Sequence, residues 1–423
     1  MKNLSKVTAL ALLISLGGGL TTTSVMAKPN YEEIEKRKKA KTQVMSERVG
    51  KKVMKAFELF QAEPQDIPGA IAVLAELEPS DKFDAATVNN YLGQMYAQIE
   101  KYDLAAKHLK LAIDGDALNF KDHAQSMRTL GDIYLSNKRF KEAKALYLGW
   151  IDFTGEEDPQ VYLRIANVHY ELKEYKQVIA PADRNIDLLR GKEPNKQAFD
   201  MKIGAYSELK DFKSAVKVTE EVLKTWPEKP KSWTLLGRFY MQVEDYKKGL
   251  STMEIAYKNG YFDSETDYRI LASLYSLNDI PWKAGLTLEK ALKDDKIKRN
   301  KDNVNAMASY FHQAKEISKA AKYYQEAGAF ENDAELYRKA GSILLRIEKY
   351  SQSVTALNKA LELGTKKEGT TYTDLAEAYY HQEKYKQAYV AIKKAMEDPS
   401  TRKFAQGWSV FIKDKAARKG VKI

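Results

Sequence analysis

The sequence predicts an all-α solenoid built from about nine to ten stacked helix–turn–helix units. A pattern of small and aromatic residues recurs every 33 to 38 residues over most of the chain. Apolar residues within each copy recur at i, i+3, i+4 and i+7, which is the period of an amphipathic helix. Moreover, 22 Gly and 11 Pro among 423 residues are too few for a turn-rich β fold.

Each copy places an aromatic residue three positions after a small residue, a second aromatic six further on, and another small residue three after that. The first clear copy is Leu92-Gly93, Tyr96, Tyr102 and Ala105. Looser copies surround Ile203 and Pro281. Because one helix pair cannot bury its apolar face alone, stacked copies should share a core. The small-residue position falls at Gly93, Gly131, Ala166, Ile203, Gly237, Ala272, Ala308, Gly341 and Ala376.

These residues resemble the tetratricopeptide repeat, a helix–turn–helix unit of about 34 residues. Trp233, Leu236, Gly237 and Tyr240 carry its signature in full. The resemblance spans residues 84–398 as nine repeats. It implies a right-handed superhelix in which the first helix of each pair lines a concave groove. The small residues should mark close helix contacts, and the tyrosines at the fixed repeat position should belong to the core.

The two ends of the sequence differ from the repeats. Residues 1–27 have two lysines, an apolar stretch of 14 residues and small residues before a cleavage point after Ala27, which is typical of a signal peptide. That stretch is shorter than the roughly 20 residues needed to span a bilayer. We therefore expect a periplasmic or secreted mature chain without a transmembrane segment. Residues 28–83 are predicted as a helical segment with a degenerate capping repeat, and 399–423 as a capping helix with a basic tail.

Catalytic and metal-binding patterns are not found in the sequence. There is no cysteine, which excludes disulfides and thiolate chemistry. There is no phosphate-binding loop, nucleophile elbow, HExxH motif or EF-hand loop, and the five histidines fall in different repeats. We therefore expect a protein that is not an enzyme and that has no cofactor and no metal site.

Function is instead expected on the first helix of each repeat. With the small residue as position 8, positions 2, 5, 9, 12 and 13 should face the groove, and arginines and polar residues fill many of them. Such a face suits an extended peptide or a partner helix, because the guanidinium group binds carboxylates and carbonyls. The predicted groove residues are Asn90, Gln94, Arg128, Asp132, Asn167, Tyr170, Arg238, Arg269, Asn305, Arg338, Arg346 and Tyr380.

The predicted function is a periplasmic adaptor or scaffold that binds an envelope protein or peptide. The layout is also similar to periplasmic repeat proteins that accompany TonB-type energy-transduction systems, which implies TonB or ExbB/ExbD-like partners. The alternative is a basic structural protein on the cell wall or an anionic membrane surface, favoured by the net charge of +11. A nucleic-acid partner is not expected behind a secretion signal, and the sequence predicts no oligomeric state.

Overall fold

The computed structural model describes residues 29–423, and every regular element in that range is an α-helix, 22 in all. The chain divides into two compact units, Met1–Leu209 and Lys210–Ile423, which we name unit 1 and unit 2. The predicted signal sequence, residues 1–27, lies outside the described residues. The predicted all-α fold of helix–turn–helix repeats is confirmed.

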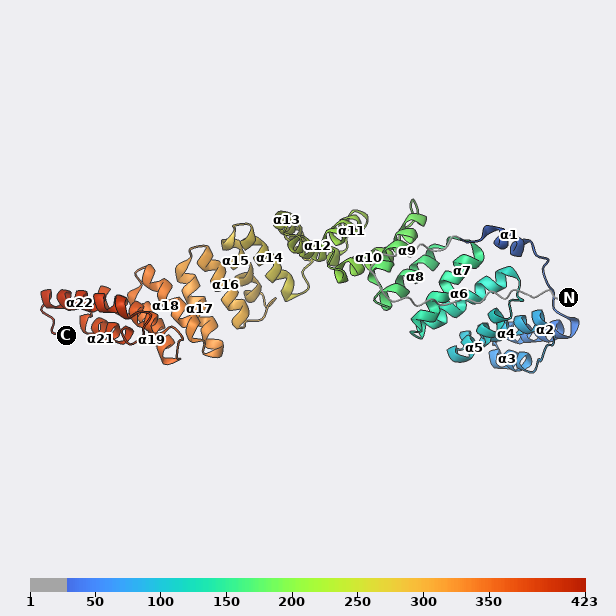
Figure 1. Cartoon of the computed structure of the whole chain (residues 1–423), viewed down its shortest axis with the longest axis horizontal. Helices are drawn as coiled ribbons and strands as arrows, with labels where there is room; N and C mark the ends of the chain where they lie inside the picture. The colour runs from blue at the N-terminus through green and yellow to red at the C-terminus, as the bar shows by residue number, and fades with distance from the viewer. Residues whose placement is uncertain (1–28) are drawn as a thin grey trace, which may run out of the picture. The chain divides into compact units, whose positions relative to one another are not determined.

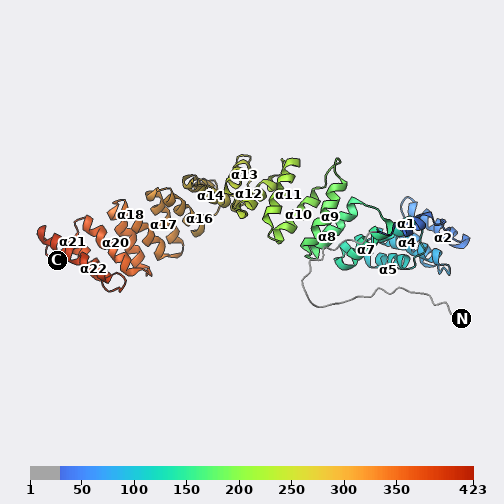
Figure 2. The same ribbon diagram turned by 45° about the horizontal axis from the view of Figure 1, so that its top comes forward.

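Unit 1 contains one separate N-terminal helix, four helix pairs and one further helix. From α2 onward, each helix packs against the next (Figures 1 and 2). The bounds are α1 (Tyr31–Lys39), α2 (Glu47–Gln61), α3 (Ile67–Ala75), α4 (Lys82–Gln98), α5 (Tyr102–Asp114), α6 (Phe120–Ser136), α7 (Phe140–Thr154), α8 (Pro159–Glu171), α9 (Tyr175–Leu188) and α10 (Lys196–Glu208).

Unit 2 begins with a single helix, continues with five pairs and ends with a single helix. A core runs from Met253 to Ala356 through successive pairs, as expected when neighbouring repeats bury each other's apolar faces. The bounds are α11 (Phe212–Thr225), α12 (Pro230–Gln242), α13 (Tyr246–Lys258), α14 (Glu265–Leu277), α15 (Pro281–Lys293), α16 (Lys301–Gln313), α17 (Ile317–Glu331), α18 (Ala334–Arg346), α19 (Tyr350–Glu362), α20 (Glu368–His381), α21 (Tyr385–Ala395) and α22 (Arg402–Arg418).

The turn after the first helix of each pair has the same backbone form throughout residues 84–398. A residue with φ between +57° and +62° lies seven positions after each small residue, and none of these residues is glycine. In the first copy the N–H of Lys101 donates to the carbonyl oxygen of Tyr96 at 2.9 Å, the bond of a Schellman turn. The left-handed residues are Glu100, Lys138, Lys173, Lys210, Glu244, Asp279, Lys315, Glu348 and Glu383.

The small residues mark close helix contacts, as predicted. A Cβ atom placed on Gly93 would lie 2.5 Å from Cγ of Leu109, and one on Gly237 would lie 2.5 Å from Cγ of Met253. Both neighbours belong to the second helix of the same pair. The equivalent Ala272 is fully buried. A larger side chain here would force the paired helices apart.

The repeated tyrosines also lie where the sequence places them. Tyr134, Tyr240 and Tyr275 are buried, at 5 to 8% exposure, and the other tyrosines of the series are half-buried. The irregular copy at Pro281 has a simple cause, because this proline is the first residue of α15, where a missing N–H costs nothing. Within residues 29–423, no helix combines the length and apolarity that crossing a membrane requires.

Candidate functional site

The predicted groove residues all lie on the first helices of the pairs, six in each unit. We name the surface of these helices the A-face. In unit 1 it belongs to α4, α6, α8 and α10, and in unit 2 to α12, α14, α16, α18 and α20. The structure separates its side chains into those held by neighbouring helices and those left free for a partner.

On α4, Asn90 does not face solvent, which corrects the sequence prediction. Its side chain is only 2% exposed. Its Oδ1 accepts hydrogen bonds from Nε2 of Gln94 at 2.9 Å and from Oγ of Ser126 at 2.8 Å. Asn90 therefore fixes α4 to α6, because a buried amide oxygen needs such partners. Gln94 is exposed.

On α6, Arg128 and Asp132 join neighbouring repeats. Arg128 donates from Nη1 to Oδ2 of Asp158 at 2.9 Å, and its guanidinium lies 5.5 Å from the centre of the Trp150 ring. Asp132 accepts from the hydroxyl of Tyr147 at 2.6 Å and pairs with Arg164 of α8. Burial, and then the Asp132 carboxylate, raise the pKa of Tyr147. Both residues are therefore already engaged within unit 1.

On α8, Asn167 is half-buried, and Tyr170 packs on the next first helix. A Cβ on Gly204 of α10 would lie 2.9 Å from the Tyr170 hydroxyl, so the glycine makes room for this ring. Tyr170 also meets Tyr175 edge to face, with ring centres 5.5 Å apart. This tyrosine therefore packs between helices rather than standing free in a groove.

In unit 2, Arg238 of α12 forms a buried link to α14. Its Nη2 donates to Oδ1 of Asp267 at 2.7 Å, and the Asp267 side chain has no exposed surface. Asp267 also accepts from Oγ of Ser264 at 2.8 Å, in a capping box that starts α14. Arg238 thus compensates a buried charge, and its removal would leave that charge unpaired.

On α18, Arg338 is also held within the unit. Its Nε donates to Oε2 of Glu335 at 2.8 Å, and 18% of the side chain is exposed. Beside it, the hydroxyl of Ser342 donates to Asp374 of α20. Burial raises the pKa of Asp374, while Ser342, Arg338 and the nearby Arg346 act against that increase.

Arg269 of α14 and Arg346 of α18 differ from these arginines. Both are exposed, and neither forms an ion pair within residues 29–423. Arg346 lies close enough to His312 to lower its pKa, together with burial, which is the main cause, and Lys339. The exposed Arg346 and the half-buried Lys339 give this part of unit 2 a positive potential. Asn305, on α16, is half-buried.

At the end of unit 2, Tyr380 belongs to an aromatic cluster with the last helix. Its ring centre lies 5.8 Å from that of Trp408 and 5.3 Å from that of Phe411. Phe411 is 50% exposed and Phe404 is 55% exposed. Trp408 of the predicted capping helix therefore packs against the last repeat, while about half of each phenylalanine side chain remains exposed.

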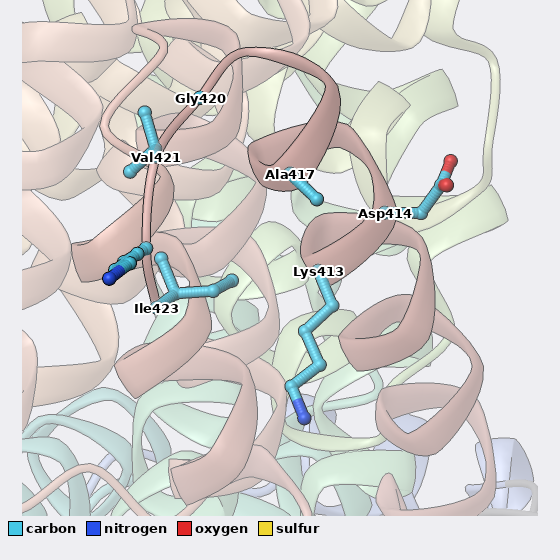
Figure 3. A pocket seen from close by; sticks show the side chains of 7 residues that line it. Lys413, Asp414, Ala417, Gly420, Val421 and Ile423 are labelled. Atoms are coloured by element: carbon cyan, nitrogen blue, oxygen red, sulfur yellow. The ribbon is translucent and has the colours of Figure 1, made fainter.

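An open hollow of 760 Å³ lies at the end of α22. Figure 3 shows Lys413 and Asp414 of the helix on one side of it and Val421 and Ile423 on the other. Gly420, with φ +72°, turns the chain, and the N–H of Val421 donates to Ala416 at 2.9 Å. Since one helix and four residues that follow it supply the whole lining, the hollow lacks the converging polar groups of a ligand site.

A second hollow, in unit 1, has a richer lining. A cleft of 720 Å³ is lined by Arg37 and Lys38 on one side and by Phe120 and Phe153 on the other. Sequence reasoning missed it because its walls lie more than 70 residues apart in the chain. Elsewhere, no group of three or more His, Asp or Glu side chains among residues 29–423 is arranged to hold a metal ion.

The fold and the A-face define a helical-repeat scaffold of the kind that mediates protein–protein interactions. A model of the tetratricopeptide repeat family matches residues 92–162, which cover the pairs α4–α5 and α6–α7 and the start of α8. The same backbone turn recurs in all nine copies. The chain is therefore similar to the tetratricopeptide family over residues 92–162, and it repeats the same turn throughout residues 84–398. No curated protein matches the sequence.

Several solved structures share the helical-repeat fold at low sequence identity. A tetratricopeptide repeat protein from Parabacteroides merdae is 14% identical, with a TM-score of 0.37, over 58% of this chain and 93% of that one. YrrB, described as having an unusual peptide-binding site, is 16% identical, with a TM-score of 0.36, over 46% of this chain and 98% of that one. The Naa15/Naa10 complex bound to HypK-THB is 13% identical, with a TM-score of 0.48, over 86% of this chain and 66% of that one. These values carry no conclusion about function.

Proposed function

We propose that the protein is a non-enzymatic adaptor of the bacterial cell envelope that binds an acidic segment of a partner protein on the A-face of unit 2. One observation carries the proposal: Arg269 and Arg346 are exposed on this face and form no ion pair within the described residues. A guanidinium group without a partner is suited to a carboxylate, which it binds through two parallel hydrogen bonds.

The surroundings of Arg346 support the same partner chemistry. Lys339 adds positive potential, and the nearby Asp374 carboxylate is half-buried and already accepts a hydrogen bond from Ser342. An incoming carboxylate would therefore meet cations rather than competing acids. Attraction of this kind also accelerates association at low ionic strength.

The location of the protein remains a proposal that rests on residues 1–27. Amino-terminal sequencing of the protein from a periplasmic fraction tests it, and the expected first residue is Lys28. An intact Met1 in the cytoplasmic fraction would overturn the envelope assignment.

Crosslinking and capture from intact cells tests the binding face. The variant to compare with wild type is Arg269→Ala with Arg346→Ala, since neither side chain supports the fold. Its matched control is Lys224→Ala with Lys258→Ala, which removes the same charge from exposed positions on α11 and α13. We expect the same envelope protein with wild type and control, and its loss with the arginine variant. Equal capture by all three would contradict the proposal.

The identity of the captured partner tests the narrower prediction of a role in TonB-type transport. Recovery of TonB or of ExbB/ExbD-like components would support a role in TonB-type transport, and recovery of an unrelated envelope protein would remove that role while keeping the adaptor.

A second candidate function rests on the exposed face of α22. Phe404 and Phe411 lie exposed on a helix whose two ends are basic, with Arg402 and Lys403 at one and Lys415 and Arg418 at the other. This composition suits an anionic membrane surface. Sedimentation with vesicles of anionic lipid, at low salt and at about 0.5 M salt, tests it, because diffuse surface binding is screened at high ionic strength. Binding that persists unchanged at high salt would count against it.

A further inference from the structure

The N-terminal segment of unit 1 does not stack with the repeats that follow it. Residues 29–46, which we name the arm, contain α1 and an extended link to α2. In Figure 1, α1 lies apart from α2 and α3, its neighbours in the sequence, and near α7. The arm instead contacts the loops around residues 115–120 and 153–156, which connect successive pairs of unit 1.

The body of unit 1 offers the arm an aromatic platform. The rings of Phe120 and Phe153 stack with their centres 5.1 Å apart, and the ring of His123 lies 4.5 Å from that of Phe153. Gly155, in the left-handed conformation at the end of α7, leaves room beside these rings. Acidic side chains surround them, at Asp116, Asp122 and Glu156.

The arm fits this platform with one apolar anchor and two cations. Ile34 is 3% exposed, and a Cβ on Gly155 would lie 3.0 Å from its Cδ1. Arg37 lies 5.2 Å from the centre of the Phe153 ring and donates from Nη1 to Asp116 at 3.1 Å. Lys38 lies 5.5 Å from the centre of the Phe120 ring. Cations over aromatic faces are attracted by the ring quadrupole.

The link to α2 is held by backbone hydrogen bonds. The N–H of Gln43 donates to Oδ1 of Asn119 at 2.9 Å, and Nδ2 of Asn119 donates to the carbonyl oxygen of Gln43 at 3.2 Å. Between these bonds and α1, the chain borders the cleft of 720 Å³ and touches the body only through exposed side chains.

Little of α1 is buried, so the attachment of this helix is weak compared with that of the repeats. Ile34 is the one buried side chain of α1. The Arg37–Asp116 pair is 38% and 62% exposed, and exposed pairs contribute about 0 to 1 kcal/mol. A segment held in this way can open locally while the remainder of unit 1 stays folded.

We propose that the arm platform is a second protein-binding site, that its ligand is a basic amphipathic segment of a partner protein, and that the arm occupies it in cis. The arm shows what the site accepts: an apolar anchor, then cations three and four residues later along one helical face. The acidic rim supplies the charge complementarity. This surface belongs to unit 1, whereas the A-face proposed above to bind an acidic segment belongs to unit 2, and the two take ligands of opposite charge.

Because the arm occupies the platform in cis, a partner segment must compete with it for binding. A tethered segment has an effective local concentration in the millimolar range, so a free peptide of equal intrinsic affinity competes poorly. Release of the arm should therefore strengthen binding of an added peptide without any change to the platform itself.

Fluorescence anisotropy with a labelled peptide of residues 30–43 tests the proposal on the mature full-length chain. In the released variant, Ile34→Asp with Arg37→Glu, we expect at least tenfold tighter peptide binding than in wild type. Addition of Phe153→Glu to the released variant should abolish the gain. Since that change touches the core edge, Asp116→Lys serves as a second platform variant on an exposed loop residue. A peptide carrying the Ile34 and Arg37 substitutions is the control ligand.

Three outcomes would overturn the proposal. The first is equal binding by wild type and the released variant. The second is binding that neither Phe153→Glu nor Asp116→Lys weakens while circular dichroism shows both variants folded. The third is a concentration-dependent dimer of wild type in analytical ultracentrifugation that Asp116→Lys removes, which would assign the platform to the arm of a second copy.

Discussion

The arm of unit 1 and the link between α12 and α14 of unit 2 use charged side chains in opposite ways. In unit 2, Arg238 pairs with a carboxylate that has no exposed surface. In unit 1, Arg37 of the arm pairs with an Asp116 side chain that is 62% exposed. A buried charge that loses its partner costs several kcal/mol, whereas an exposed pair exchanges easily with water. The same residue type is therefore structural in one region and available for exchange in the other.

This difference also sorts the predicted groove residues. Arg128 and Arg238 join neighbouring repeats of their own unit and Arg338 pairs within its own helix, while Arg269 and Arg346 lie exposed. Position on the repeat alone does not decide the role, because Arg128, Arg269 and Arg338 share one repeat position. The role of each arginine depends on whether a carboxylate lies within reach of its guanidinium group.

The largest expected effect compares Arg238→Ala with Arg37→Ala. Loss of Arg238 leaves Asp267 buried and unpaired, so we expect a loss of about 3 kcal/mol in the free energy of unfolding. Loss of Arg37 should cost less than about 1 kcal/mol. Urea unfolding measures the difference, and hydrogen exchange over residues 230–277 should localise the Arg238 effect to unit 2. Equal losses would mean that burial does not distinguish the two pairs.

Glycine substitutions compare a position in unit 2 where paired helices touch with an open helix position in unit 1. Gly237→Ala in unit 2 should cost about 1 to 3 kcal/mol, because the new Cβ would lie 2.5 Å from Met253. Gly50→Ala in α2 of unit 1 meets no atom within 4 Å and should stabilise by about 0.5 to 1 kcal/mol through helix propensity. Thermal unfolding of both variants checks the opposite signs, and a stabilised Gly237→Ala would refute the close contact.

The repeat spacing allowed the fold to be predicted because each copy repeats the same packing problem. Gly93, Gly131, Gly237 and Gly341 must be small for a reason within one helix pair, and such local reasons are visible in a sequence. Local periodicity likewise places the groove residues on the first helices, as the structure confirms.

The partners of those residues could not be predicted in the same way. The link from Arg238 to Asp267 spans 29 residues and depends on the rotation of α12 against α14. The burial of Asn90 depends on Ser126 of the next repeat. The contact between Arg37 and Asp116 spans 79 residues and depends on the arm leaving the repeat stack. Contacts between residues this far apart in the chain leave no local pattern in the sequence.

The dependence of the free energy of unfolding on alkaline pH tests the core of unit 2 separately from the arm. Burial, and then a hydrogen bond to Glu254, raise the pKa of Tyr275 above its ordinary value near 10. The folded state therefore holds the proton more tightly than the unfolded state. The stabilisation is complete below about pH 10 and is lost as pH rises from there through the folded pKa.

Tyr275→Phe removes this linkage, so the urea midpoint of the variant should fall less steeply than that of wild type between about pH 9.5 and 11. Parallel slopes for wild type and variant would contradict the assigned role of Tyr275.

The smallest expected effect concerns a feature that the two units share. Lys138 in unit 1 and Lys315 in unit 2 adopt φ of +58° and +61° in equivalent turns. A left-handed conformation costs a residue other than glycine about 1 to 2 kcal/mol, and the greater flexibility of glycine in the unfolded chain offsets part of that. Lys138→Gly and Lys315→Gly should therefore each stabilise by less than about 1 kcal/mol, and by equal amounts. Unequal shifts in the unfolding midpoint would show that the units differ in their turns as well as in their charged contacts.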